Sequence, residues 1–483
     1  MGSASNRRAL ALGAVALSAA LFWFSTGLDP LWWPIWFAPL PVLLVAPRLS
    51  GRLAFVAAFA ARSLGGLCIW PYLAIPLPAV VILAVLVVVP SIVFGACVVL
   101  YRAHLERDSL WQAGLALPCI WIAFEYLSAV SSPHGTYGSL GYSQMDFLPV
   151  IQVASLAGPW AIGFCVLLFS SASAVLLSGK PGRAAVAGVS AALLILVLGF
   201  GVWRLQSTPS SPTVTVGLIG SDRPENMYPR TQESSLAVFH RYVAQVPALA
   251  AQGARIVVMP EHLGALVDTS LQGRASDVDR LFSEAARQND VFLVVGVDRV
   301  VTRTLLFNEA RLYSPGGPIA TYHKRHLLPG PESVFTPGRT DFMFGMALGT
   351  AGIAICKDLD FPALGRGYAL GRTDLMLVPA LDFRLDGWLH GRMAILRGVE
   401  GGFSMARAAN LGRLTLSDDR GRVLAERASD SAPFATLVGA VPVRHDPTLY
   451  SRTGDWFAWL VLILVGSALA TTLLGYFATR HDQ

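Results

Sequence analysis

Long apolar runs dominate the first part of the chain, and one more lies near its end. Most of them approach the roughly 20 residues that a helix needs to cross the hydrocarbon core of a bilayer. We expect about eight membrane spans, near Ala9–Leu28, Leu31–Ala46, Leu53–Tyr72, Pro78–Tyr101, Gln112–Val130, Leu156–Leu177, Ala184–Trp203 and Trp456–Ala478. The second run is the shortest and is rich in Pro and Trp, so its ends are the least defined.

The pattern changes at about Ser211. Short β-rich runs there alternate with polar, helix-compatible stretches, which is typical of layered α/β domains. We expect strands at Val214–Ile219, Arg255–Met259, Val291–Val297, Thr304–Tyr313, Gly352–Cys356, Leu375–Val378, Gly402–Ala408, Leu414–Ser417 and Thr436–Val441, and helices at Glu233–Gln252, Ala275–Asn289 and Leu389–Gly401. The sequence thus predicts a multi-pass helical membrane domain over residues 1–205, an α/β domain over 211–445 and a closing membrane helix over 455–479.

The composition agrees with a chain that lies largely in lipid. Hydrophobic residues make up 54% of the 483 residues and charged residues only 14%, whereas soluble domains carry roughly 25% charged residues. The formal net charge is +6. In a membrane protein this excess suggests basic cytoplasmic loops. The sequence holds no nucleic-acid-binding motif, so we expect the membrane, and no nucleic acid, as a partner.

The loop charges predict the orientation of the spans. Alternate segments between them are basic, with Arg7 and Arg8, Arg48 and Arg52, Arg102 and Arg107, and Lys180 and Arg183. The opposite loops, near Asp29, over Leu73–Leu77 and over Ser131–Asp146, hold no Lys or Arg. Because basic loops stay in the cytoplasm, we expect both chain termini inside and the α/β domain outside. A charged start before an apolar run also fits a signal peptide, but the further runs that follow favour a first membrane helix.

Polar residues at membrane depth are functional candidates. Arg62 interrupts the third predicted span and Glu125 the fifth. The sequence leaves two interpretations open, a pair that faces the helix bundle or side chains that snorkel to the surface. The segment Ser132–Gln144, rich in Pro, Gly and aromatic residues, is either a lipid-facing re-entrant segment or a loop.

Of the five cysteines, only one lies in the polar part of the chain. Cys68, Cys97, Cys119 and Cys165 lie in apolar runs, as packing residues do. The remaining thiol, Cys356, has no partner in its own domain. There is no disulfide framework and no CxxC zinc spacing, and we expect no metal and no cofactor.

Cys356 closes an apolar run, Gly352–Ile355, and polar residues and Pro362 follow it. This pattern predicts a buried strand that ends in a sharp turn with the thiol at its tip. Such an elbow exposes the sulfur and brings a backbone N–H near it, which is the geometry of nucleophilic catalysis. An inert core cysteine also fits this stretch on its own.

Two further stretches supply the partners that a catalytic thiol needs. The predicted strand Arg255–Met259 is followed closely by Glu261, and the Pro/Gly-rich loop Tyr322–Glu332 carries Lys324. A carboxylate can act as general base toward a thiol, and a lysine can hold a developing oxyanion and favour the thiolate. Glu261, Lys324 and Cys356 are therefore the candidate catalytic residues.

In this order, Glu261, Lys324 and Cys356 resemble the catalytic triad of the nitrilase (carbon–nitrogen hydrolase) superfamily. The likeness continues at Leu375–Ala380, Trp388, His390, Met393-Ala394, Arg397–Glu400 and Ala406–Asn410. The resemblance implies a four-layer αββα sandwich for the α/β domain. It also implies that Glu332 is a second essential carboxylate that orients Lys324, with a structural ion pair as the alternative.

The whole architecture is similar to the apolipoprotein N-acyltransferase family of bacterial envelopes. Family-like stretches are Trp121–Leu127, Leu140–Gln144 and Thr448–Trp456. The resemblance implies a bacterial inner-membrane protein with its catalytic domain on the periplasmic side. It implies transfer of an acyl chain from a phospholipid to a thioester on Cys356, and then to the α-amine of a diacylglyceryl-cysteine lipoprotein. Glu261 would be the general base and Lys324 the oxyanion ligand.

Several positions depart from the family pattern. The family's usual Tyr-Glu after the cysteine is Lys357-Asp358 here, and we expect Asp358 to support the site. Its usual Gln-Gly-Asn at the first strand end is Leu218-Ile219-Gly220, and the tryptophan after it has no clear counterpart, although Tyr228 is near. A membrane-anchored amidase or nitrilase-type hydrolase, and a membrane scaffold with a silent domain, therefore stay open. Candidate lid loops are Leu263–Gly273 and Ala380–Gly387.

Overall fold

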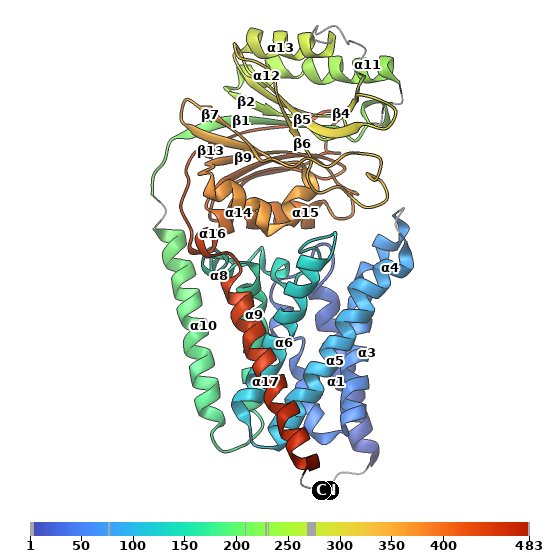
Figure 1. The fold of residues 1–483 in the computed structure, drawn as a ribbon, viewed down its shortest axis with the longest axis vertical. Helices are drawn as coiled ribbons and strands as arrows, with labels where there is room; N and C mark the ends of the chain where they lie inside the picture. Colours follow the sequence, from blue (N-terminus) through green and yellow to red (C-terminus); the bar gives the residue numbers. More distant parts are fainter. Residues whose placement is uncertain are drawn as a thin grey trace. The chain divides into compact units, whose positions relative to one another are not determined.

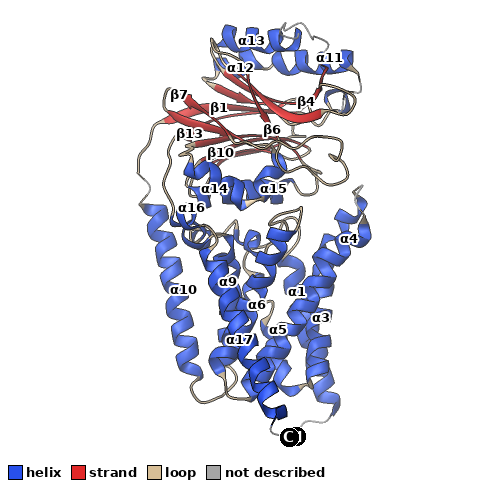
Figure 2. Ribbon diagram, in the orientation of Figure 1, coloured by secondary structure: helices blue, strands red, loops and turns tan. Residues whose placement is uncertain are grey.

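The computed structural model describes residues 4–75, 78–207, 209–227, 229, 231–267 and 277–481. The chain divides into two compact units. The first consists of Met1–Ser132, Thr136–Gln206 and Thr453–Gln483, and the second of Pro133–Gly135 and Ser207–Arg452. In the described residues, the first unit holds helices without strands, while both sheets lie in the second (Figure 2).

The helices of the first unit are mostly long and apolar. They are α1 (Ala4–Ser25), α2 (Leu40–Val45), α3 (Gly51–Gly66), α4 (Ala79–Leu83), α5 (Val89–Glu106), α6 (Leu110–Ser131), α7 (Leu148–Ile151), α8 (Ala154–Ala157), α9 (Pro159–Leu176), α10 (Arg183–Gln206) and α17 (Trp456–His481). By length and composition, six stretches of the described chain can cross a membrane: Arg8–Ser25, Gly51–Ala74, Ala79–Glu106, Leu110–Ser131, Pro159–Leu176 and Arg183–Gln206.

The second predicted span is not one long helix. Over Pro34–Arg48 the chain forms three short helices, because a proline stands at the start of each and cannot continue the preceding helical hydrogen bonds. The last predicted span, Trp456–Ala478, lies within the single helix α17. The count of about eight spans is therefore approximate.

The segment between α1 and α3 nevertheless returns along these two helices. A Cβ on Gly65 would overlap Phe22 and lie 2.9 Å from the carbonyl oxygen of Ala19, so the C-terminal ends of these two packed helices touch. The helices therefore run parallel, and residues 26–50 must return along them. At the other end of this return, Arg102 of α5 donates to the carbonyl oxygen of Leu49 (2.8 Å).

Two sheets form the centre of the second unit (Figure 1). In one, the order is β13 (Ala435–Pro442), β1 (Thr213–Gly220), β2 (Ile256–Val258), β4 (Phe292–Val300), β5 (Leu306–Tyr313) and β6 (Ala320–His323), with β3 (Ala265–Val267) beside β4. In the other, it is β12 (Val423–Ala428), β11 (Arg413–Ser417), β10 (Ser404–Asn410), β9 (Leu375–Leu381), β8 (Gly349–Ile353) and β7 (Phe342–Met346).

Helices cover the outer face of each sheet (Figure 1). The first sheet packs against α11 (Gln232–Val243), α12 (Val246–Ala251) and α13 (Asp277–Asn289), and the second against α14 (Pro362–Leu370) and α15 (Gly387–Gly401). Between the sheets, Val258 and Val294 share a buried core with Ile353 and Leu377. These layers confirm the predicted αββα sandwich.

Most of the elements that were not predicted from the sequence are edge strands. β6, β7 and β12 end their sheets, and their alternating or exposed residues give little apolar signal. The short β3, which pairs only with β4, and α14 were also missed. The helix expected over Glu233–Gln252 is divided into α11 and α12, because Pro247 at the start of α12 lacks the N–H that would continue the ladder.

Candidate active site

Glu261 lies just beyond β2, where the chain leaves the first sheet. Its side chain is 2% exposed, and its N–H donates to the carbonyl oxygen of Ala380 (3.3 Å). Gly296 of β4 allows the turn to lie close, since a Cβ there would overlap the oxygen of Pro260 and lie 2.5 Å from the Glu261 Cα. The backbone of β4 therefore fixes the position of this carboxylate.

Lys324 follows β6 directly and points into a pair of carboxylates. Its Nζ lies 2.7 Å from Oε1 of Glu261, and 2.9 and 2.8 Å from the two oxygens of Glu332. The side chain is 3% exposed, and the backbone N–H of Lys324 donates to the carbonyl oxygen of Asn308 (2.8 Å). The structure thus brings Glu261, Lys324 and Glu332 into one buried group.

Cys356 starts a short 3-10 helix, η7 (Cys356–Asp360), with a φ of 41°. The strand predicted to end at the thiol is wrong at that end, because β8 stops at Ile353 and the N–H of Ile355 donates to Asp358 (3.1 Å) instead of to a neighbouring strand. A positive φ is a strained conformation for a residue with a Cβ. The thiol therefore lies at a sharp turn, and its Sγ is 3.5 Å from the carbonyl oxygen of Leu381.

The electrostatics of these groups are coupled. Burial alone would lower the pKa of Lys324, but the charges of Glu261 and Glu332 raise it well above its usual range. Burial raises the pKa of the Cys356 thiol, the charge of Glu261 raises it further, and Lys324 opposes both. The thiol is therefore protonated at neutral pH, and a base must take its proton before the sulfur can attack.

Asp358 joins the cysteine turn to the lysine loop. The carboxylate is fully buried and accepts hydrogen bonds from Tyr322 Oη (2.7 Å) and from the N–H groups of Ile355 (3.1 Å), Arg325 (3.1 Å) and His326 (2.8 Å). The neighbouring Lys357 is also buried, and its Nζ donates to Asp360 (3.0 Å). Asp358 therefore joins these two loops through its hydrogen bonds, and its role in a reaction stays a prediction.

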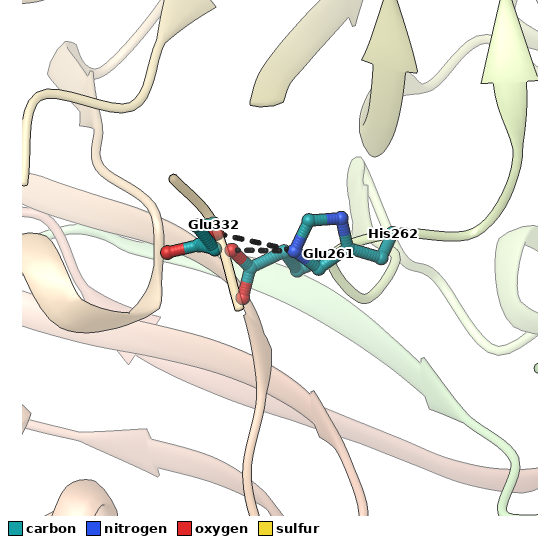
Figure 3. A group of neighbouring side chains, drawn as sticks. All are labelled: Glu261, His262 and Glu332. Atoms are coloured by element: carbon teal, nitrogen blue, oxygen red, sulfur yellow. Dashed lines mark hydrogen bonds and ion pairs between the residues drawn. The ribbon is translucent and has the colours of Figure 1, made fainter. Parts of the chain in front are cut away.

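Sequence reasoning missed His262 and Asn308. His262 directly follows Glu261 in the sequence. Its Nε2 lies 3.2 Å from Oε1 of Glu332 and 3.5 Å from Oε1 of Glu261 (Figure 3). Asn308 Nδ2 donates to the same two oxygens, both at 2.6 Å. The available signal was a group of polar residues, Asn308, Glu309 and Arg311, inside the predicted strand Thr304–Tyr313, because buried polar groups need partners.

A second buried pair lies near the thiol. Both guanidinium Nη atoms of Arg407 bond the carboxylate of Asp382, at 2.9 and 2.5 Å, and both charges act on the pKa of Cys356. Burial disfavours a charged His390, but Asp386 and hydrogen bonds with Asp382 and Asp386 raise its pKa to about 10. Asp382 and Asp386 belong to the candidate lid Ala380–Gly387, whose first two residues are part of β9 and whose last residue begins α15.

Two groups of side chains in the described part of the chain have the spacing of metal ligands: Glu261, His262 and Glu332, and Asp382, Asp386 and His390. In the first group Lys324 already bonds both carboxylates, and in the second Arg407 bonds Asp382. Because protein cations balance these carboxylates, we assign no metal to them.

Two further polar candidates belong to the first unit. Arg62 and Glu125 are both buried in the first unit, which favours bundle-facing side chains over snorkelling. Arg62 lies over the rings of Phe22 and Trp121, and Glu125 accepts from Trp121 Nε1 (2.8 Å). Of the candidate lid Leu263–Gly273, residues 268–273 lie outside the described residues, as does Tyr228.

Comparisons with known proteins agree along the chain. The model of the apolipoprotein N-acyltransferase N-terminal domain matches residues 18–172, and the carbon–nitrogen hydrolase model matches residues 220–433. An apolipoprotein N-acyltransferase of Geobacter metallireducens is 28% identical, with 96% of this chain and 94% of that protein covered. One of Nitrosomonas europaea is 23% identical, with 93% and 95% covered.

Among solved structures, an amidase of the nitrilase superfamily from Nesterenkonia AN1 is 19% identical, with a TM-score of 0.41 over 49% of this chain and 93% of the amidase. The two matched domains and the full-length relatives show that this chain belongs to the apolipoprotein N-acyltransferase family.

Proposed function

We propose that the protein transfers an acyl chain from a phospholipid to the N-terminal amine of diacylglyceryl-cysteine lipoproteins, through a thioester on Cys356. Two facts support this proposal: the family to which the chain belongs, and one geometric observation. The observation is that Lys324 is held at 2.7 and 2.8 Å between two buried carboxylates, and that its charge and the charge of Glu261 both act on the Cys356 thiol.

In the first half-reaction Glu261 takes the proton from Cys356 Sγ, and the sulfur attacks the carbonyl carbon of the sn-1 ester. The carbonyl oxygen becomes an oxyanion that Lys324 and backbone N–H groups near Cys356 stabilise. The C–O bond then breaks, Glu261 returns the proton to the leaving alkoxide, and a lysophospholipid departs. The acyl chain remains as a thioester.

In the second half-reaction the α-amine of the lipoprotein attacks the thioester carbon. Glu261 takes a proton from the amine, the C–S bond breaks, and the sulfur regains its proton. Glu332 holds Lys324 in place through both steps. Bulk water must be kept from the thioester, since hydrolysis would waste the acyl chain.

We also propose that the catalytic unit lies on the periplasmic side of the bacterial inner membrane, with both chain termini in the cytoplasm. The basic segments that alternate along the apolar runs support this orientation. Reporter fusions after residue 206 and after residue 178 should report opposite sides of the membrane.

Intact-protein mass spectrometry tests the chemistry. Purified protein incubated with phospholipid, without acceptor, should gain the mass of one acyl chain, and Cys356→Ala should gain none. A reporter lipoprotein with a diacylglyceryl-cysteine should then gain one acyl chain. If the wild-type protein gains no acyl chain, the proposal is wrong. If it does, but the product is free fatty acid and the reporter is unchanged, the protein is a hydrolase.

A further inference from the structure

His262 is a polar residue of the site to which the proposed reaction gives no role. It follows Glu261 in the turn after β2, and its φ of 57° is the left-handed conformation. Its ring faces the carboxylates of Glu261 and Glu332 (Figure 3) and, on its other side, that of Asp298. Nδ1 is 2.6 Å from Oδ1 of Asp298 on β4, and Nε2 faces Oε1 of Glu332 at 3.2 Å and Oε1 of Glu261 at 3.5 Å.

The hydrogen-bond donors decide the protonation of this ring. Asn308 Nδ2 lies 3.2 Å from His262 Nε2, but its two hydrogens are needed by Glu261 and Glu332, each 2.6 Å away. No hydrogen remains for Nε2, and ionised carboxylates only accept. Nε2 must therefore donate to Glu332 and Nδ1 must donate to Asp298. A ring that donates from both nitrogens is an imidazolium.

The net charge of the cluster shows what the imidazolium contributes. Glu261, Glu332 and Asp298 contribute three negative charges, and Lys324 and His262 contribute two positive ones. Without the imidazolium the net charge of the cluster would change from −1 to −2. Burial would raise the pKa of Glu332, but Lys324 and then His262 lower it far below its usual range. Glu332 thus stays ionised and available to both cations.

We propose that His262, as an imidazolium, is a positioning residue that links Glu332 to Asp298 and thereby fixes the direction in which Lys324 presents its ammonium group. Asp298 belongs to β4, whereas Glu332 lies in the irregular loop after β6. The imidazolium therefore ties a loop carboxylate to the sheet. This role rests on the proposed function, because the direction of Lys324 matters only if an oxyanion forms beside it.

The proposal predicts an alkaline limit for the acylation rate. Burial opposes the charged ring, but Asp298 and Glu261 raise the pKa of His262 well above its usual range. When the imidazolium loses a proton at high pH, a nitrogen lone pair must face a carboxylate, and the link fails. The groups that face the ring are Glu261 from its own turn, Asp298 from β4, Asn308 from β5, and Glu332 and Phe335 from the loop.

The test is a double-mutant cycle on Cys356 acylation by phospholipid, followed by mass spectrometry from pH 6 to pH 10. We expect His262→Ala and Asp298→Asn each to slow acylation about tenfold, and the double variant to be no slower than His262→Ala. The control is His323→Ala, which removes a nearby histidine that pairs with Glu309 (3.2 Å) and should stay within about twofold of wild type. Multiplying effects, or a His262→Ala variant with the wild-type rate and pH profile, would overturn the proposal.

A second readout needs no lipid. Loss of the imidazolium should raise the apparent pKa of Cys356, measured by iodoacetamide alkylation, by roughly half a unit, which slows alkylation about threefold below that pKa. If wild type forms no acyl-enzyme, the proposed function fails and this profile alone decides the role of His262, with an unchanged profile counting against it. If His262→Ala does not fold, His262→Gln, which keeps one donor without the charge, is measured in its place under the same criteria.

Discussion

Replacing Lys324 with methionine would leave Glu261 and Glu332 buried without the cation between them. Lys324 and Glu261 are 2.7 Å apart, with side chains 3% and 2% exposed. Removing one partner of such a pair costs about 3–5 kcal/mol, because the remaining charge has lost its solvation and gained nothing. For a unit of this size, each kcal/mol lowers the unfolding temperature by roughly 2–4 °C. We therefore expect the midpoint to fall by about 6–20 °C at pH 8.

The loss should depend on pH in a defined direction. In the wild type the pKa of Glu332 is lowered, so its stabilisation is present above the unfolded value of 4.5 and lost as the pH falls through the folded value. Without Lys324, burial favours the protonated acid, and the variant loses stability as the pH rises above that unfolded value. The difference between variant and wild type should hence be larger at pH 8 than at pH 5.

The assay is a thermal scan of the purified, detergent-solubilised protein, followed by tryptophan fluorescence. Arg255→Met is the matched control, because Arg255 and Asp290 are also 2.7 Å apart but 63% and 76% exposed. Exposed pairs contribute about 0–1 kcal/mol, so this variant should unfold within about 4 °C of wild type. A Lys324→Met protein as stable as wild type at pH 8, or equally destabilised at pH 5 and pH 8, would refute the reasoning.

Two other substitutions separate position from stability. Gly296→Ala should displace Glu261 and slow Cys356 acylation at least about tenfold. Gly345→Ala, in a strand position with open space around it, should not slow it. Equal acylation rates for the two variants would contradict this prediction. Tyr322→Phe removes a donor from Asp358 (2.7 Å) and should cost about 1–2 kcal/mol in thermal unfolding and also slow acylation. Tyr313→Phe, which removes a buried donor from Asp279 (2.8 Å), should cost as much but leave acylation unchanged.

The fold class could be predicted from the sequence, because it follows from the periodicity of the apolar residues and from the composition. Continuous Val/Ile/Leu strands and helix-length apolar runs indicate burial on both faces and membrane spans, whatever their neighbours are. Edge strands such as β6, β7 and β12 were not predicted, since a strand at the edge of a sheet needs few apolar residues. The return of the chain along α1, through the short helices over Pro34–Arg48, was not predicted either. It is set by the contact between α1 and α3, whose residues are far apart in the sequence.

The chemistry divides in the same way. The sequence by itself determined which residue types were available, since Glu261, Lys324 and Cys356 stand at strand ends in a recognisable order. Only the tertiary structure brought Asp298 and Asn308, from β4 and β5, to the ring of His262. Hydrogen bonds and ion pairs act over about 3 Å between residues far apart in the chain, so the linear order of the residues does not show which of them meet.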